Sequence, residues 1–199
     1  MQMHMIRRAD KDVEVSVPED DGAVSAEVDE SGSIQLVVAQ VGARMGMQIW
    51  IPEADRAAVL AAWTGDPPPL LERLPLNYDE TTMRTLEQID VLWLKGRSIR
   101  RAFAVEGTVS VFSGISRIAD LLALQPNIDI RLHIVAPEAN RDRVISEIRR
   151  PVFSLLDRGP LSESCSFLAF SSVRKLANLP HLQHLSDTVL EEYAEQAKE

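Results

Sequence analysis

Apolar residues at helical spacing follow a polar, acidic stretch at the start of the chain. Residues 1–32 carry several acidic runs, a composition that predicts a flexible acidic N-terminal arm. From Ser33, which suits an N-cap, apolar positions recur at mostly helical spacing as far as Gly46, a common C-terminal stop. We therefore expect the first core helix to begin at Ser33.

Short apolar runs alternate with helical segments over the next forty residues. The run 47–51, closed by Pro52, predicts a strand, and 53–63 returns to a helical composition. A glycine and three prolines end that helix. For 70–87 we expect a loop that contains one helical turn near its end.

Two β-rich runs in the middle of the chain predict a hairpin. They are 89–94 and 99–106, and they flank 95–98, which places a glycine in the turn. A helix is expected over 111–124, where apolar residues share one side. The run 128–135 alternates and then becomes wholly apolar, which predicts an internal strand.

The last third of the chain continues the alternation of helices and strands. Pro137 is expected to open a helix that ends before Pro151, and a short strand over 166–170 precedes a further helix. The tail 186–199 is predicted to be an acidic C-terminal helix. This order of elements predicts an α/β fold with a mixed central sheet flanked by helices, as one domain over 33–185.

Composition narrows the class of protein. The single cysteine, Cys165, excludes an internal disulfide and a cysteine-rich zinc site. No signal segment opens the sequence, and no apolar run approaches the roughly 20 residues that cross a bilayer. We therefore expect a soluble, cytoplasmic protein with no membrane partner.

The net charge of −9 argues against a protein that coats phosphates generally. Any contact with DNA would need a local basic patch. Arginines do cluster at 97–101 and at 141–150, which permits such a patch.

The predicted hairpin brings acidic side chains together. If its turn is 96–98, Asp90 lies opposite position 104. Gln88 then lies opposite Glu106, and these four positions share one face because side chains alternate along a strand. The other face carries an apolar set: Ile89, Val91, Trp93, Phe103 and Val105.

Asp90 and Glu106 interrupt apolar strands, where an unpaired charge is costly. One compensator is a hard divalent cation such as Mg²⁺, which takes oxygen ligands from one or two carboxylates. The alternative is that both acids lie near strand ends and pair with arginine. Three arginines are candidates for that role: Arg97, Arg100 and Arg117.

Three segments carry a resemblance to a known family. They are 88–93 (QIDVLW), 102–108 (AFAVEGT) and 113–121 (SGISRIADL). Together they resemble the PD-(D/E)XK nuclease superfamily, and within it a bacterial restriction-endonuclease-like group, with similarity extending over 34–170. The resemblance implies a restriction-endonuclease-like αβββαβ core. It also implies Mg²⁺-dependent hydrolysis of DNA phosphodiester bonds, DNA as partner, and a homodimer.

The resemblance assigns roles to residues of this chain. Asp90 corresponds to the metal-binding aspartate, and Glu106 to the last motif position, as a ligand or water-orienting base. Position 104 should hold the second acidic ligand, but here it is Ala104, whose methyl group cannot bind Mg²⁺. Contacts to a phosphate are implied for Arg117, with Thr108 and Ser113 as further donors. At a strand-to-helix junction, however, serine and threonine more often act as simple helix caps.

Three explanations of Ala104 remain open: a substitution that traps an inactive enzyme, natural loss of activity, or an acid that has moved into the site from elsewhere. Candidates for the last are Glu53, Asp55 and Glu87. The leading hypothesis is therefore a Mg²⁺-dependent nuclease with an altered site. Its rival is a catalytically inactive nuclease-fold module that binds DNA or another protein, which Ala104 and the acidic net charge favour.

Overall fold

The computed structural model describes most of the chain. The described residues are 3–8, 11–16, 21–107, 111–125, 128–156 and 159–197. Among them, no helix is both long and apolar enough to cross a bilayer.

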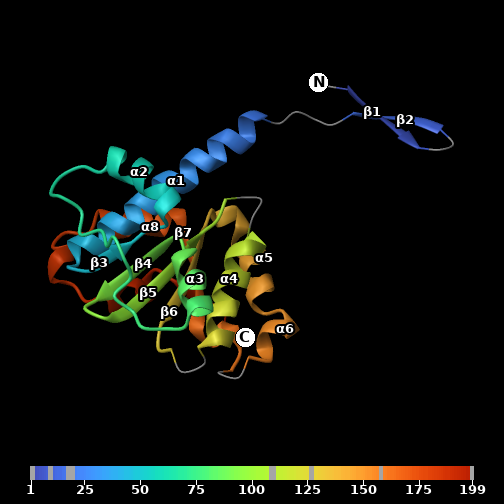
Figure 1. The fold of residues 1–199 in the computed structure, drawn as a ribbon. Helices are drawn as coiled ribbons and strands as arrows, with labels where there is room; N and C mark the ends of the chain where they lie inside the picture. Colours follow the sequence, from blue (N-terminus) through green and yellow to red (C-terminus); the bar gives the residue numbers. More distant parts are fainter. Residues whose placement is uncertain are drawn as a thin grey trace.

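A six-stranded mixed sheet forms the centre of the molecule (Figure 1). Its strands run in the order β3-β4-β5-β6-β7-β8. The first three are antiparallel neighbours, β5, β6 and β7 are parallel, and β8 is antiparallel to β7. The predicted mixed sheet is thus confirmed. The strands are β3 (Gln48–Trp50), β4 (Val91–Lys95), β5 (Ser98–Val105), β6 (Arg131–Ala136), β7 (Cys165–Ala169) and β8 (Glu195–Gln196).

Helices cover both faces of this sheet, as predicted (Figure 1). Side chains alternate along each strand, so Trp93 and Phe103 face one apolar cluster while Leu92 and Ala102 face the other. The Trp93 face is covered by α1 (Asp21–Arg44), α2 (Glu53–Ala62) and α8 (Phe170–Ala177). The opposite face is covered by α3 (Glu80–Glu87), α4 (Val111–Leu124), α5 (Arg141–Ile148), α6 (Pro151–Ser154) and α7 (Leu161–Ser164).

The β4–β5 hairpin has the predicted register at one end and a different turn at the other. Val91 pairs with Phe103, as the sequence predicted. The three-residue turn is wrong, because Lys95 pairs with Ser98 and leaves a two-residue loop. A register shift after Trp93 absorbs the difference. Gly96 supports the tight loop with a φ of +62°, a backbone conformation that glycine adopts readily.

The N-terminal region differs from the prediction in its elements. Helix α1 begins at Asp21, so the predicted start at Ser33 is wrong. Acidic residues favour the N-terminal end of a helix as well as a polar arm, and composition does not separate the two. Strands β1 (Met3–Arg8) and β2 (Lys11–Ser16) form a separate antiparallel pair. The flexibility of this arm stays a prediction.

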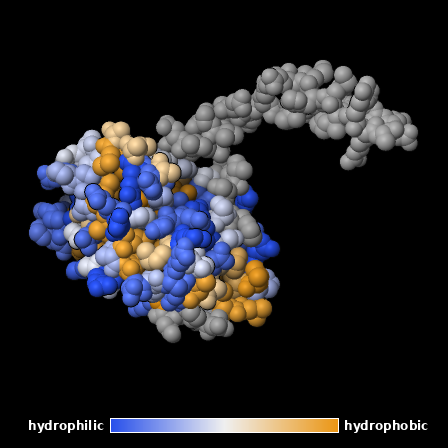
Figure 2. All heavy atoms as spheres, viewed as in Figure 1, coloured by the Kyte–Doolittle hydropathy of each residue, from blue (hydrophilic) through white to orange (hydrophobic). Residues whose placement is uncertain are grey.

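The C-terminal tail is not the predicted acidic helix. It contains a 3₁₀ turn, η3 (Asp187–Glu192), followed by strand β8 on the edge of the sheet. The remaining 3₁₀ turns are η1 (Glu138–Asn140) and η2 (Leu182–His184). Pro151 does interrupt a helix as predicted, but it also occupies the first turn of α6. Apolar side chains gather on the surface around α6, where Val152 and Leu155 are exposed (Figure 2).

Candidate active site

Three charged side chains meet at one end of the sheet. Asp90 immediately precedes β4, Glu106 immediately follows β5, and Arg117 lies on α4. The antiparallel pairing of β4 and β5 brings the two acids together, because the start of one strand lies beside the end of the other. The guanidinium of Arg117 then contacts both carboxylates, at 3.2 Å from Asp90 Oδ1 and 3.3 Å from Glu106 Oε1.

Asp90 lies outside the strand ladder, which corrects one detail of the predicted pairing. Instead of lying across from residue 104 in a ladder, its Oδ2 accepts a hydrogen bond of 2.7 Å from the backbone N–H of Val105. Burial raises the pKa of the Asp90 carboxyl above its ordinary value, while Arg117 and the Val105 N–H oppose that rise. Ile89 accordingly packs in the apolar cluster on the α4 side of the sheet, whereas Val91 packs in the cluster on the opposite side.

Glu106 is almost fully buried, with 1% of its side chain exposed. Its carboxylate lies against Gly114 of α4, and a Cβ at that position would come within 3.0 Å of Glu106 Oε1. The same Cβ would lie 2.8 Å from the Cβ of Ala104. The missing side chain of Gly114 therefore lets α4 pass closely over this end of β5 and makes room for the carboxylate.

Arg117 is held by backbone groups as well as by the two acids. Its Nη1 donates to the carbonyl of Gln88 at 2.6 Å, and its Nε to the carbonyl of Ser113 at 3.4 Å. The arginine pairing that the sequence left open as an alternative is therefore present, with Arg117 as the partner. Arg97 and Arg100 do not share this role, because β5 begins next to them and ends at the site.

The other predicted site residues have different positions. Ala104 lies within β5, 2% exposed, and packs in the apolar cluster beneath α4. Ser113 is the third residue of α4 and has an exposed side chain. Thr108 lies outside the described residues. The predicted phosphate contacts of Thr108, Ser113 and Arg117 stay predictions.

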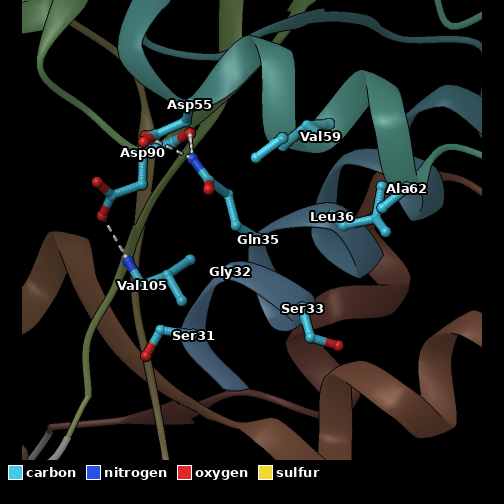
Figure 3. Close-up of a pocket in the computed structure, with 11 residues that line it drawn as sticks. Ser31, Gly32, Ser33, Gln35, Leu36, Asp55, Val59, Ala62, Asp90 and Val105 are labelled. Carbon is cyan, nitrogen blue, oxygen red and sulfur yellow. Dashed lines mark hydrogen bonds between the residues drawn. The ribbon is translucent and has the colours of Figure 1, made fainter. Parts of the chain in front are cut away.

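A cleft of about 590 Å³ opens beside Asp90, between α1 and α2 (Figure 3). Gln35 of α1 points into this region, and its Nε2 donates to the backbone carbonyl of Asp90 at 3.0 Å and to Asp55 Oδ2 at 3.1 Å. Three acids were candidates for one that has moved into the site. The fold places Asp55 beside Asp90, whereas Glu53 and Glu87 are exposed. Sequence reasoning missed Gln35. Its signal was a polar residue within the apolar pattern that begins at Ile34.

The donor set can be compared with what a divalent cation requires. Mg²⁺ demands near-octahedral oxygen coordination, and a nuclease site of the expected kind supplies two acidic ligands next to the catalytic group. Here position 104 supplies a methyl group, and Arg117 already contacts Asp90 and Glu106. Within the described ranges, no group of three or more His, Cys, Asp or Glu side chains is arranged to hold a metal ion. As arranged, these residues do not fit Mg²⁺.

Comparison with known proteins connects this chain to restriction enzymes. The family model described as the type II restriction enzyme NmeDI C-terminal domain matches residues 13–198. A curated relative, the type II restriction enzyme NmeDI of Neisseria meningitidis serogroup C, is 26% identical over 167 residues. The match covers 80% of this chain and 45% of the relative, so the chain spans less than half of that protein's length. No solved structure matches the chain significantly.

Proposed function

The chain belongs to the family of the type II restriction enzyme NmeDI C-terminal domain, and we propose that it is a nuclease-fold domain that binds duplex DNA without hydrolysing it. The observation that carries the proposal is the convergence of Asp90 and Glu106 on one guanidinium, at a site where position 104 offers only a methyl group. In this proposal the pair occupies the position of a former nuclease centre, and Ala104 replaces one of the expected ligands.

The order of elements supports the finer assignment to the restriction-endonuclease-like fold of the PD-(D/E)XK superfamily. Leaving aside α2 and α3, helix α1 is followed by the antiparallel strands β3, β4 and β5, then by α4 and by β6 parallel to β5. With those two helices set aside, this order agrees with the αβββαβ core that the resemblance implies, which supports the proposal. The carboxylates lie where β4 begins and β5 ends, at the edge of a cleft.

Electrostatics at this end of the sheet give a direct test of DNA binding. If a phosphate approaches the site, the negative charge of Asp90 repels it, and replacing that charge should tighten binding. At contact distance one unit charge is worth about 1 kcal/mol in water, which corresponds to roughly fivefold in affinity. Arg117 supplies the attractive contact to the phosphate in this proposal.

The experiment compares the DNA affinity of two variants, each with one carboxylate neutralised, at opposite ends of the sheet. Asp90→Asn should bind a labelled DNA duplex about fivefold more tightly than the wild type in EDTA, measured by fluorescence anisotropy. Glu163→Gln is the matched control, because exposed Glu163 precedes β7 whereas the site lies at the far end of the parallel strands. If neither the wild type nor Asp90→Asn binds DNA at low salt, or if both substitutions act equally, the proposed site is wrong.

Mg²⁺-dependent hydrolysis is a second candidate function, and the surviving pair Asp90 and Glu106 favours it. Asp90 accepts a hydrogen bond from the backbone N–H of Val105, the residue after Ala104, so we expect a glutamate at position 104 to add a second acid near Asp90. Under this candidate the wild type nicks supercoiled plasmid with Mg²⁺. Under our proposal only Ala104→Glu does so, and the uncharged Ala104→Gln, of nearly equal size, stays inactive.

A further inference from the structure

Arg117 is the positive charge at the centre of the site. It contacts one carboxylate just before β4 and one just after β5, and both acids are largely withdrawn from water, with 18% and 1% of the Asp90 and Glu106 side chains exposed. A guanidinium is never deprotonated in proteins, and its planar fork presents several donors at fixed angles. The charge of this site is therefore compensated by a side chain that belongs to the chain itself.

We propose that Arg117 is the resident cation of this site, and that the wild-type chain takes up no Mg²⁺ or Mn²⁺ between Asp90 and Glu106. The inference deepens the proposed function, because it concerns the same site and explains why that site does not cleave. Its test uses no DNA, so its failure and the failure of DNA binding are separate results.

The charge balance of the three residues explains the proposal. With both carboxylates ionised, Asp90, Glu106 and Arg117 together carry a single negative charge. An incoming divalent cation would have to approach a fixed guanidinium that also donates to the Gln88 carbonyl at 2.6 Å. Asp55 lies near Asp90, but its Oδ2 accepts a hydrogen bond from Gln35 at 3.1 Å, and an acid at position 104 would have added negative charge to offset this repulsion.

Another arginine in the chain provides a matched comparison. Arg141 also forms ion pairs with two acids, Asp142 and Glu195, but these lie at the surface, 92% and 46% exposed. Water solvates surface carboxylates when their partner is removed, whereas Asp90 and Glu106 depend on a nearby positive charge. Removing Arg117 should therefore allow Asp90 and Glu106 to bind an added cation. Removing Arg141 should produce no such binding at Asp142 and Glu195.

The test measures thermal unfolding of the metal-stripped chain with and without millimolar MnCl₂, supported by calorimetric titration of Mn²⁺. The wild type and Arg141→Gln should show no change in Tm and no saturable heat. Arg117→Gln should have a lower Tm than the wild type in EDTA. Mn²⁺ should then raise the Tm of Arg117→Gln by about 3 °C, because binding to the folded state alone stabilises it.

Two results would overturn the proposal. The first is a wild-type Tm that rises with Mn²⁺, together with loss of that rise in Asp90→Asn. The second is a folded Arg117→Gln chain that does not respond to Mn²⁺. Should Arg117→Gln fail to fold, Ala104→Glu replaces it, because a third carboxylate also gives the site a second net negative charge. Ala104→Glu must then bind Mn²⁺ while Ala104→Gln does not, and equal behaviour of the two contradicts the proposal.

Discussion

Glycines within helices set the closest approaches between elements. A Cβ on Gly42 of α1 would lie 2.8 Å from Ile49 Cδ1 and closer still to the Trp93 indole, and a Cβ on Gly114 of α4 would meet Glu106 and Ala104. Gly32, also in α1, has nothing within 4 Å of the same position. The space beside the Cα therefore distinguishes Gly32 from Gly42 and Gly114.

Replacing each of these glycines with alanine should separate the effect of backbone flexibility on stability from the effect of packing. Gly32→Ala should stabilise the chain by about 0.5–1 kcal/mol, because alanine restricts the unfolded backbone. Gly42→Ala and Gly114→Ala should instead destabilise it by about 1–3 kcal/mol, since each forces a packed neighbour to move. Urea denaturation measures all three free energies of unfolding. Equal effects at the three positions would show that the helices are not packed as described.

His133 is a second residue whose surroundings determine a measurable property. Its Nε2 lies 3.1 Å from Arg101 Nη1, and its Nδ1 lies 2.7 Å from Ser166 Oγ. Because arginine can only donate, Nε2 must accept, and the proton resides on Nδ1, which donates to Ser166. Burial, with Arg101 and Arg131 nearby, lowers the pKa of His133 to about 3.

This lowered pKa predicts a loss of stability in acid. In the unfolded chain His133 takes up a proton near its ordinary pKa of 6.5, whereas the folded chain resists protonation down to about 3. The contribution of His133 to the free energy of unfolding is therefore complete above pH 6.5. It is lost as the pH falls toward 3, by at most about 1.4 kcal/mol per pH unit. His133→Gln should show a flatter profile of unfolding free energy between pH 6.5 and 4. Parallel profiles would contradict this account.

At the scale of elements, a buried ion-pair network fastens the C-terminal segment to the sheet. Arg101 of β5 is 2% exposed, and its guanidinium contacts Asp187 at 2.8 Å and Glu191 at 3.0 Å. Both acids belong to η3, which leads into β8. The segment is thus joined to the sheet by charge at one end and by strand pairing at the other.

Breaking this network should lower the free energy of unfolding far more than breaking a surface ion pair does. Asp187→Ala should lower the free energy of unfolding by about 3 kcal/mol, because it leaves Arg101 buried with one partner fewer. The control is Arg84→Ala, which removes an exposed pair with Glu80 and should cost at most about 0.5 kcal/mol. Chemical denaturation compares the two variants. A loss at Asp187 as small as at Arg84 would mean that the network does not hold the segment.

Elements were predictable from sequence where the information is local. Alternation and turn composition indicated β4, β5, α4 and β6, and the pairing of Val91 with Phe103 followed from the spacing. The tail could not be predicted in this way. Its acids suggested a solvated helix, because their partner Arg101 lies 86 residues away from Asp187 in the sequence.

The same limit applies to the candidate site. Asp90 and Glu106 were predicted as neighbours, and the structure joins them through Arg117. The sequence permits arginine both as a partner for the acids and as a contact to phosphate, and spacing alone does not separate these roles. Gln35 was missed because nothing in a helical pattern indicates that one polar side chain reaches the backbone of Asp90, 55 residues later in the sequence.

At the scale of the whole molecule, several arginines of the two sequence clusters already contact acids within the part of the chain that the structure describes. Arg101 is buried, Arg100 approaches Asp187, and Arg141 and Arg150 pair with neighbouring acids. With a net charge of −9, the DNA binding that we propose must depend on local attraction and be strongly sensitive to salt. The homodimer implied by the family resemblance stays a prediction, which sedimentation of the chain with and without DNA tests.

The central claim is that this restriction-enzyme-related domain holds DNA at a site that no longer cleaves it. The most direct measurement incubates the wild-type chain with a labelled plasmid-derived duplex and Mg²⁺, and records binding and strand cleavage in the same sample. We expect a salt-sensitive complex and no cleavage product. Cleavage by the wild type, or the absence of any complex at low salt, would contradict the account.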